Sequence, residues 1–163
     1  MTVCLRLPEA PATPLNFPSV AYATVAVLAD TMVQHGRPAH VLLVDDDPDI
    51  RALYGGRLRA DGFEVSVAAD GRQALAAAGG PPTIILLDLR MPGMDGLEVL
   101  DALKRNASTA AVPVVMLSNE CDPAARATCV RSGAVAWWTK SAVAPCELSR
   151  RVRELLSRGP VPV

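Results

Sequence analysis

Short apolar runs alternate with helical stretches along the chain from residue 41 onward. Each run has the length of a single strand, and the segment after it carries apolar residues at helical spacing. This alternation is typical of a parallel sheet whose strands are joined by crossover helices. The predicted strands cover residues 41–44, 63–68, 83–87, 112–117 and 135–138.

Two of these runs also predict their place in the sheet. Residues 83–87 form a continuous β-branched and leucine run, which predicts the most buried strand. Residues 63–68 alternate apolar and polar positions, which favours a strand nearer the sheet edge. The resulting fold class is α/β, with a doubly wound parallel sheet of five strands and five helices.

The helices between the strands begin and end at recognisable signals. Asp47 is suited to be an N-cap before Pro48, and Asp70 can cap the next helix. Glycines follow several of the helical segments, as expected at helix C-termini. The predicted helices run from Asp47 to the Asp61-Gly62 pair and over residues 70–78, 96–104, 123–132 and 147–157.

The first 38 residues have a different composition, with five prolines and many alanines and valines. Prolines favour extended or irregular backbone. A helix over residues 19–34 and a poorly ordered leader both fit this composition. We therefore expect a Pro/Ala-rich N-terminal extension over 1–38, one domain over 39–158 and a short tail over 159–163.

Composition excludes several classes of protein. The formal net charge is −1, so no basic field would draw the chain to nucleic acid or an anionic membrane. The four cysteines show neither zinc-ligand spacing nor a disulfide pattern, and we interpret them as reduced thiols. The apolar segment 20–29 is about half the length that a bilayer requires. We expect a cytoplasmic protein without direct nucleic-acid or membrane binding.

Polar residues follow four of the predicted strands. They are Asp45 and Asp46 after the first strand, Asp88 after the third, Ser118 after the fourth and Lys140 beyond the fifth. Sites in doubly wound sheets lie beyond the carboxyl ends of the strands, so these side chains should converge. Three carboxylates in one cleft repel one another unless a hard divalent cation compensates their charge. Mg²⁺ meets this requirement because it takes oxygen ligands, and Mn²⁺ is the alternative ion.

The motifs around these residues resemble a known family. The segments Val41-Leu-Leu-Val-Asp-Asp-Asp-Pro48 and Leu87-Asp-Leu-Arg-Met-Pro-Gly-Met-Asp-Gly96, together with Ser118 and Lys140, are similar to the receiver domain of bacterial two-component response regulators. The resemblance spans about 120 residues. It implies a flavodoxin-like fold with strand order 2-1-3-4-5, and a stand-alone domain of the chemotaxis-regulator type.

The resemblance implies a role for each site residue. Asp88 would be the phosphoacceptor, and the metal ion would be held by Asp45, Asp46, Asp88 and the backbone carbonyl of Arg90. Lys140 and Ser118 would bind the phosphoryl oxygens. Trp137, three residues before the lysine, would be the aromatic switch residue.

The implied function is phosphorylation-dependent signalling. A sensor histidine kinase or a histidine phosphotransfer protein would donate the phosphoryl group, and a downstream protein would bind the face made by the fourth helix, the fifth strand and the fifth helix. We expect no separate output domain, a monomer or a phosphorylation-linked dimer, and no enzymatic activity beyond Mg²⁺-dependent self-phosphorylation and self-dephosphorylation.

Two alternative functions remain open from the sequence. A degenerate receiver would serve as a constitutive docking module for other proteins. A phosphohydrolase of the haloacid-dehalogenase type would also form an aspartyl phosphate, but its Asp-x-Asp-x-Thr/Val motif fails at Asp49.

The chain departs from the family pattern beside the site. Ser141 replaces the proline that usually follows the lysine, and Asn119 replaces the small residue that usually follows the switch hydroxyl. We expect a looser loop at Ser141 and restricted entry of water or donor at Asn119. Arg90 and Glu120 occupy the two variable positions that flank the phosphorylation site, and we predict that they form an ion pair across its mouth.

Overall fold

A five-stranded parallel sheet forms the centre of the computed structural model, which describes residues 32–33, 37–119 and 122–158. The strand order is β4-β3-β5-β6-β7, which is the predicted order 2-1-3-4-5. As predicted, β4 lies at an edge and the fully buried β5 lies in the centre. The strands are β3 (His40–Val44), β4 (Glu64–Ala68), β5 (Ile84–Asp88), β6 (Val114–Ser118) and β7 (Ala136–Thr139).

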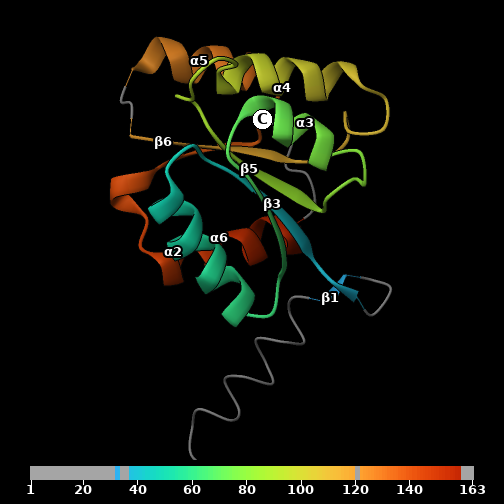
Figure 1. Cartoon of the computed structure of the whole chain (residues 1–163), viewed down its shortest axis with the longest axis vertical. Helices are drawn as coiled ribbons and strands as arrows, with labels where there is room; N and C mark the ends of the chain where they lie inside the picture. The colour runs from blue at the N-terminus through green and yellow to red at the C-terminus, as the bar shows by residue number, and fades with distance from the viewer. Residues whose placement is uncertain (1–31, 34–36, 120–121, 159–163) are drawn as a thin grey trace, which may run out of the picture.

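Helices cover both faces of the sheet (Figure 1). Three of them, α3, α4 and α5, lie on one face, and the other two, α2 and α6, lie on the opposite face. Their bounds are α2 (Pro48–Ala60), α3 (Gly71–Ala77), α4 (Gly96–Arg105), α5 (Pro123–Arg131) and α6 (Pro145–Arg158). A short 3₁₀ helix, η1 (Lys140–Ala142), connects β7 to α6.

The sheet separates two hydrophobic cores. Alternate residues of β3 point to opposite faces, so Leu42 packs under α3, α4 and α5 whereas Leu43 packs under α2 and α6. The neighbouring tryptophans of β7 divide in the same way, with Trp137 packed against the first core and Trp138 inside the second. The strands are therefore anchored on both faces, which leaves their carboxyl ends as a rigid platform for the residues that follow.

Local signals set most helix boundaries. The Asp47 side chain accepts hydrogen bonds from the Asp49 and Ile50 amides, which confirms it as the N-cap of α2. Asp95 and Glu98 form a reciprocal capping box at the start of α4. Gly133, with φ of +95°, follows α5 in a conformation that side chains rarely adopt.

Two element starts differ from the sequence predictions by two residues. β6 begins at Val114 rather than residue 112, because Val112 closes a turn onto Thr109 and its carbonyl accepts a 2.8 Å hydrogen bond from Lys104 Nζ. α6 begins at Pro145, two residues before the predicted start, since proline is well suited to the first helical turn.

Part of the N-terminal segment also differs. Met32–Val33 (β1) and Arg37–Pro38 (β2) pair as antiparallel strands, so the helix considered for residues 19–34 does not include Met32 and Val33. The rest of that helix lies outside the described residues. Across the described ranges, no helix is long and apolar enough to cross a membrane.

Candidate functional site

Three carboxylates meet where β3 and β5 end. Asp45 directly follows β3 and Asp88 is the last residue of β5. One carboxylate oxygen from each of Asp45, Asp46 and Asp88 lies within 4.8 Å of the others. Asp45 and Asp88 are buried, whereas Asp46 is exposed. The structure therefore brings together the three side chains that the sequence placed at the strand ends, and it leaves one of them open to solvent.

Lys140 lies against the two buried carboxylates. Its Nζ atom is 2.6 Å from Asp45 Oδ2 and 2.9 Å from Asp88 Oδ2, and its side chain is 10% exposed. Burial lowers the pKa of Lys140, but the hydrogen bonds and charges of Asp45 and Asp88 outweigh it and the net shift is upward. Lys140 is therefore a fixed positive charge at the base of the site.

The pKa of Asp88 is also raised. Burial is the largest cause, and the Asp45 carboxylate adds to it, while Lys140 and a backbone hydrogen bond from Arg90 act in the opposite direction. One ammonium group does not balance two buried carboxylates, so the pocket favours additional positive charge. A cation held there would favour the ionised form of Asp88.

The donor set fits a magnesium ion. Carboxylate oxygens are the ligands that Mg²⁺ prefers, and its coordination normally retains several waters. Asp45 Oδ2 is fully buried, and it shares the single ammonium group of Lys140 with Asp88 Oδ2. The exposed carboxylate of Asp46 provides access from solvent. Asp45, Asp46 and Asp88 are thus the residues that would hold the ion.

Backbone contacts fix the acidic loop after β3. The Asp45 amide donates to the Ala68 carbonyl at 3.1 Å, and the Asp47 amide donates to Asp45 Oδ1 at 3.1 Å. Arg51 Nη1 donates to the Asp45 carbonyl oxygen at 2.6 Å. Because Asp47 caps α2, it faces the helix rather than the carboxylate cluster, as expected for a structural residue.

The loop after Asp88 returns close to the strand it leaves. The Gly96 amide donates to the Leu89 carbonyl at 2.8 Å, and a Cβ atom at Gly96 would lie 2.1 Å from the Asp88 carbonyl oxygen. Only glycine allows the start of α4 to approach the strand end this closely. The Asp88 backbone is therefore held by the helix that follows it.

The remaining predicted residues within the described ranges lie on or just beyond the neighbouring strands. Ser118 ends β6 and is buried, Trp137 on β7 is partly buried, and Arg90 is exposed two residues beyond the end of β5. Asn119 is exposed, and its Oδ1 accepts a 2.9 Å hydrogen bond from the Ser141 amide. Glu120 lies outside the described residues, so its pairing with Arg90 stays a prediction, as do the roles of Ser118 and Trp137.

Tyr54 is a site residue that sequence reasoning missed. Its buried side chain reaches from α2, and its hydroxyl donates to the backbone carbonyls of Lys140 and Val143, each at 3.1 Å. From the sequence alone, a tyrosine on the buried face of a helix is interpreted as an ordinary core residue. Its only distinguishing signal is a hydroxyl that needs a partner once buried.

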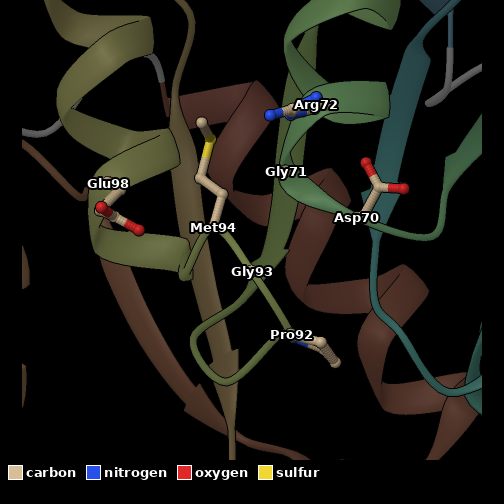
Figure 2. A pocket seen from close by; sticks show the side chains of 7 residues that line it. All are labelled: Asp70, Gly71, Arg72, Pro92, Gly93, Met94 and Glu98. Atoms are coloured by element: carbon tan, nitrogen blue, oxygen red, sulfur yellow. The ribbon is translucent and has the colours of Figure 1, made fainter.

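A cavity of about 400 Å³ opens between the starts of α3 and α4 (Figure 2). Its two carboxylates are already used, since Asp70 accepts from the Gln73 amide and Glu98 from the Asp95 amide. The Met94 side chain lies between the two helices. The lining is Asp70, Gly71, Arg72, Pro92, Gly93, Met94 and Glu98. None of the three clustered aspartates lines it, so it is a crevice separate from the predicted chemistry.

Comparison with known proteins identifies the class that this fold and site define. The family model described as the response regulator receiver domain matches residues 41–153. The chain belongs to this family of two-component signalling proteins.

Individual relatives agree with this assignment. The two-component response regulator ORR11 of Oryza sativa subsp. indica is 35% identical over 133 residues, which cover 80% of this chain and 90% of ORR11. The DNA-binding response regulator MtrA of Mycolicibacterium smegmatis is 38% identical over 131 residues, which cover 80% of this chain but only 54% of MtrA. The chain thus matches about half of that DNA-binding relative.

A solved structure shows the same fold. Vibrio cholerae chemotaxis protein CheY4 aligns with a TM-score of 0.67 and 34% identity, covering 71% of this chain and 97% of CheY4. The strand order and the two helical layers predicted from the sequence are therefore those of a chemotaxis-type receiver domain.

Proposed function

We propose that this chain is a phosphorylation-controlled signalling module that takes up a phosphoryl group on Asp88. The observation that supports this most strongly is the placement of Lys140 Nζ 2.9 Å from Asp88 Oδ2, within the cluster of three carboxylates. The donor is a phosphohistidine on a sensor kinase or a phosphotransfer protein. The phosphorylated chain then acts through contact with another protein.

The chemistry follows from the groups in the site. An Asp88 carboxylate oxygen attacks phosphorus, the bond between phosphorus and the donor imidazole nitrogen breaks, and an acyl phosphate forms on Asp88. Lys140 balances negative charge on the phosphoryl oxygens during the transfer. Mg²⁺, when bound by Asp45, Asp46, Asp88 and the Arg90 carbonyl, supplies further charge compensation.

Ser118 and Trp137 form the proposed switch. The Ser118 hydroxyl donates to a phosphoryl oxygen after transfer, and the Trp137 ring turns inward toward the space that Ser118 leaves. This movement shifts the equilibrium between two packings of the surface that α5, β7 and α6 form. The partly buried position of Trp137 between the core and the surface of β7 supports this role.

Phosphorylation by a small-molecule donor tests the proposal. Incubation with Mg²⁺ and acetyl phosphate should add one phosphoryl group to the wild-type chain in an intact-mass measurement. Asp88→Asn should show no such addition, because its amide is not a nucleophile. Asp49→Asn is the matched control, since Asp49 is an exposed acid on α2 outside the carboxylate cluster.

Two other results would replace the proposal. A wild-type chain that takes up no phosphoryl group would be a degenerate receiver with a docking role only. Continuous release of phosphate from unrelated phosphomonoesters would indicate a phosphohydrolase. The contacts of Asp47 disfavour that second reading, because its carboxylate caps α2 instead of facing Asp88.

We further propose that the pair formed by Arg90 and Glu120 slows loss of the phosphoryl group by screening water at the mouth of the site. Replacing both residues by alanine should shorten the lifetime of phosphorylated Asp88, measured as the decay of the phosphorylated mass after the donor is removed. Arg105→Ala is the control, since Arg105 is an exposed arginine in the last turn of α4, at the opposite end of the helix from Gly96 beside Asp88. An unchanged decay rate in the double variant would contradict the screening role.

A further inference from the structure

The two residues that depart from the family pattern are hydrogen-bonded to each other. Asn119 Oδ1 accepts from the Ser141 backbone amide at 2.9 Å, across 22 residues of sequence. The usual proline at position 141 would have no N–H to donate. The hydrogen bond therefore requires both the Asn119 side chain and a residue other than proline at position 141.

This hydrogen bond joins the loops that carry two phosphoryl-binding groups. Asn119 directly follows Ser118, and Ser141 directly follows Lys140. Ser118 and Thr139 are already paired in register by β6 and β7, so the contact adds a second connection just beyond the ends of these strands. The Ser118 and Lys140 backbones are thus held relative to each other on the side where phosphate would bind.

The contact also satisfies a helix end that has no cap of its own. Ser141 lies in η1, whose N-cap residue Thr139 makes no side-chain capping hydrogen bond. The first amides of a helix lack partners inside the helix, and Asn119 accepts one of them from a neighbouring loop. The Tyr54 hydroxyl donates to the carbonyls of Lys140 and Val143 in the same segment. The Lys140 segment is therefore held by side chains from two other parts of the chain.

We propose that Asn119 is a positioning residue that keeps Lys140 in register with Ser118 for phosphoryl transfer to Asp88. Asn119 acts through the Ser141 amide and does not touch the phosphoryl group in this role. The proposal rests on the function proposed above, and it replaces the expectation of a loose loop at Ser141 with a loop held by a specific side chain.

Three variants separate the backbone contact from the side chains. Asn119→Ala removes the acceptor, and Ser141→Pro removes the donor and restores the usual family residue. Ser141→Ala keeps the N–H and serves as the matched control. Loss of one neutral hydrogen bond should slow phosphorylation of Asp88 by acetyl phosphate roughly two- to tenfold in each of the first two variants. Ser141→Ala should react at the wild-type rate.

The double variant Asn119→Ala/Ser141→Pro gives the second criterion. If both changes break the same contact, the double variant should be no slower than the slower single variant. Mg²⁺ affinity, measured by tryptophan fluorescence, should be unchanged in all variants because the three carboxylates are untouched. A general loss of structure would lower both the rate and the Mg²⁺ affinity, and would contradict a positioning role.

Amide exchange at Ser141 tests the contact without phosphorylation. By nuclear magnetic resonance, the Ser141 amide should exchange faster in Asn119→Ala than in the wild type, while the Lys104-bound turn at Thr109–Val112 is unaffected. A wild-type rate of phosphorylation in Asn119→Ala, or a slow Ser141→Ala, would overturn the proposal. A wild-type chain that takes up no phosphoryl group would instead refute the proposed function, whatever the exchange at Ser141 shows.

Discussion

At the scale of single residues, the site depends on a glycine as much as on its charged groups. Gly96 lies at the first position of α4, where a Cβ atom would meet the Asp88 carbonyl oxygen at 2.1 Å and the Leu89 Cα at 2.8 Å. Both of these atoms belong to backbone that cannot rotate away. A side chain at position 96 would therefore displace the residue that carries the proposed chemistry.

Gly96→Ala should lower the free energy of unfolding by about 1–3 kcal/mol and also slow the phosphorylation of Asp88, because the strand end must shift to admit the methyl group. Chemical denaturation and intact-mass kinetics measure the two effects. Gly56→Ala is the control, since a Cβ atom at this position in α2 meets nothing within 4 Å. It should stabilise the chain by up to about 1 kcal/mol through helix propensity. Equal effects of the two substitutions would show that the close approach at Gly96 is unimportant.

At the scale of elements, one arginine connects the two helices on the same face of the sheet. Arg153 of α6 donates to the carbonyl oxygen of Asp61, the C-cap residue of α2, at 2.9 Å. Its guanidinium group also lies 5.3 Å from the centre of the Phe63 ring. These contacts link α6 to the turn between α2 and β4.

Arg153→Ala should lower the free energy of unfolding by about 1–3 kcal/mol, because a charged hydrogen bond and a ring contact are lost together. Arg150→Ala is the matched control on the same helix. Arg150 is exposed and forms ion pairs with Glu147 and Glu154 of its own helix, so its loss should change stability little. Urea unfolding of both variants checks the difference, and a similar midpoint for the two would refute the link.

The helices and strands were predictable from the sequence where their bounds are set by residues close by in the chain. Asp47, Pro48 and Gly133 mark helix ends within a few residues, and the apolar runs predicted the strands. The order of the strands was implied by the family resemblance. The Tyr54 and Asn119 contacts were not predictable, because they join residues 86 and 22 positions apart through backbone groups that carry no side-chain signature. The shift of β6 to Val114 depends on Lys104 in the same way.

At the scale of the whole molecule, the buried Asp88 carboxylate makes stability depend on pH when no cation is bound. Burial raises the pKa of Asp88 in the folded chain, so the folded state holds this proton more tightly than the unfolded state does. Stability therefore falls as the pH rises from the unfolded-state pKa through the folded-state pKa, and the cost is complete above that range.

Mg²⁺ should therefore raise the thermal unfolding midpoint at neutral pH. The stabilisation should reach about 2.7 kcal/mol when free Mg²⁺ is about one hundred times its Kd. Asp88→Asn and Asp46→Asn should lose most of this response, while Asp49→Asn should keep it, because Asp49 is not part of the carboxylate cluster. Calorimetry in Mg²⁺ and in EDTA gives the comparison. A shift of equal size in the Asp88→Asn chain would place the ion elsewhere.

The sheet also divides the chain's two tryptophans between its two layers. Trp137 reports on the side of α3, α4 and α5, while Trp138, only 8% exposed and with the Arg151 guanidinium 5.8 Å from its ring centre, reports on the side of α2 and α6. Single-tryptophan versions made by Trp→Phe exchange would therefore give each layer its own intrinsic optical signal. Tryptophan emission from these two neighbouring positions of β7 would therefore show whether the two layers unfold together or one after the other.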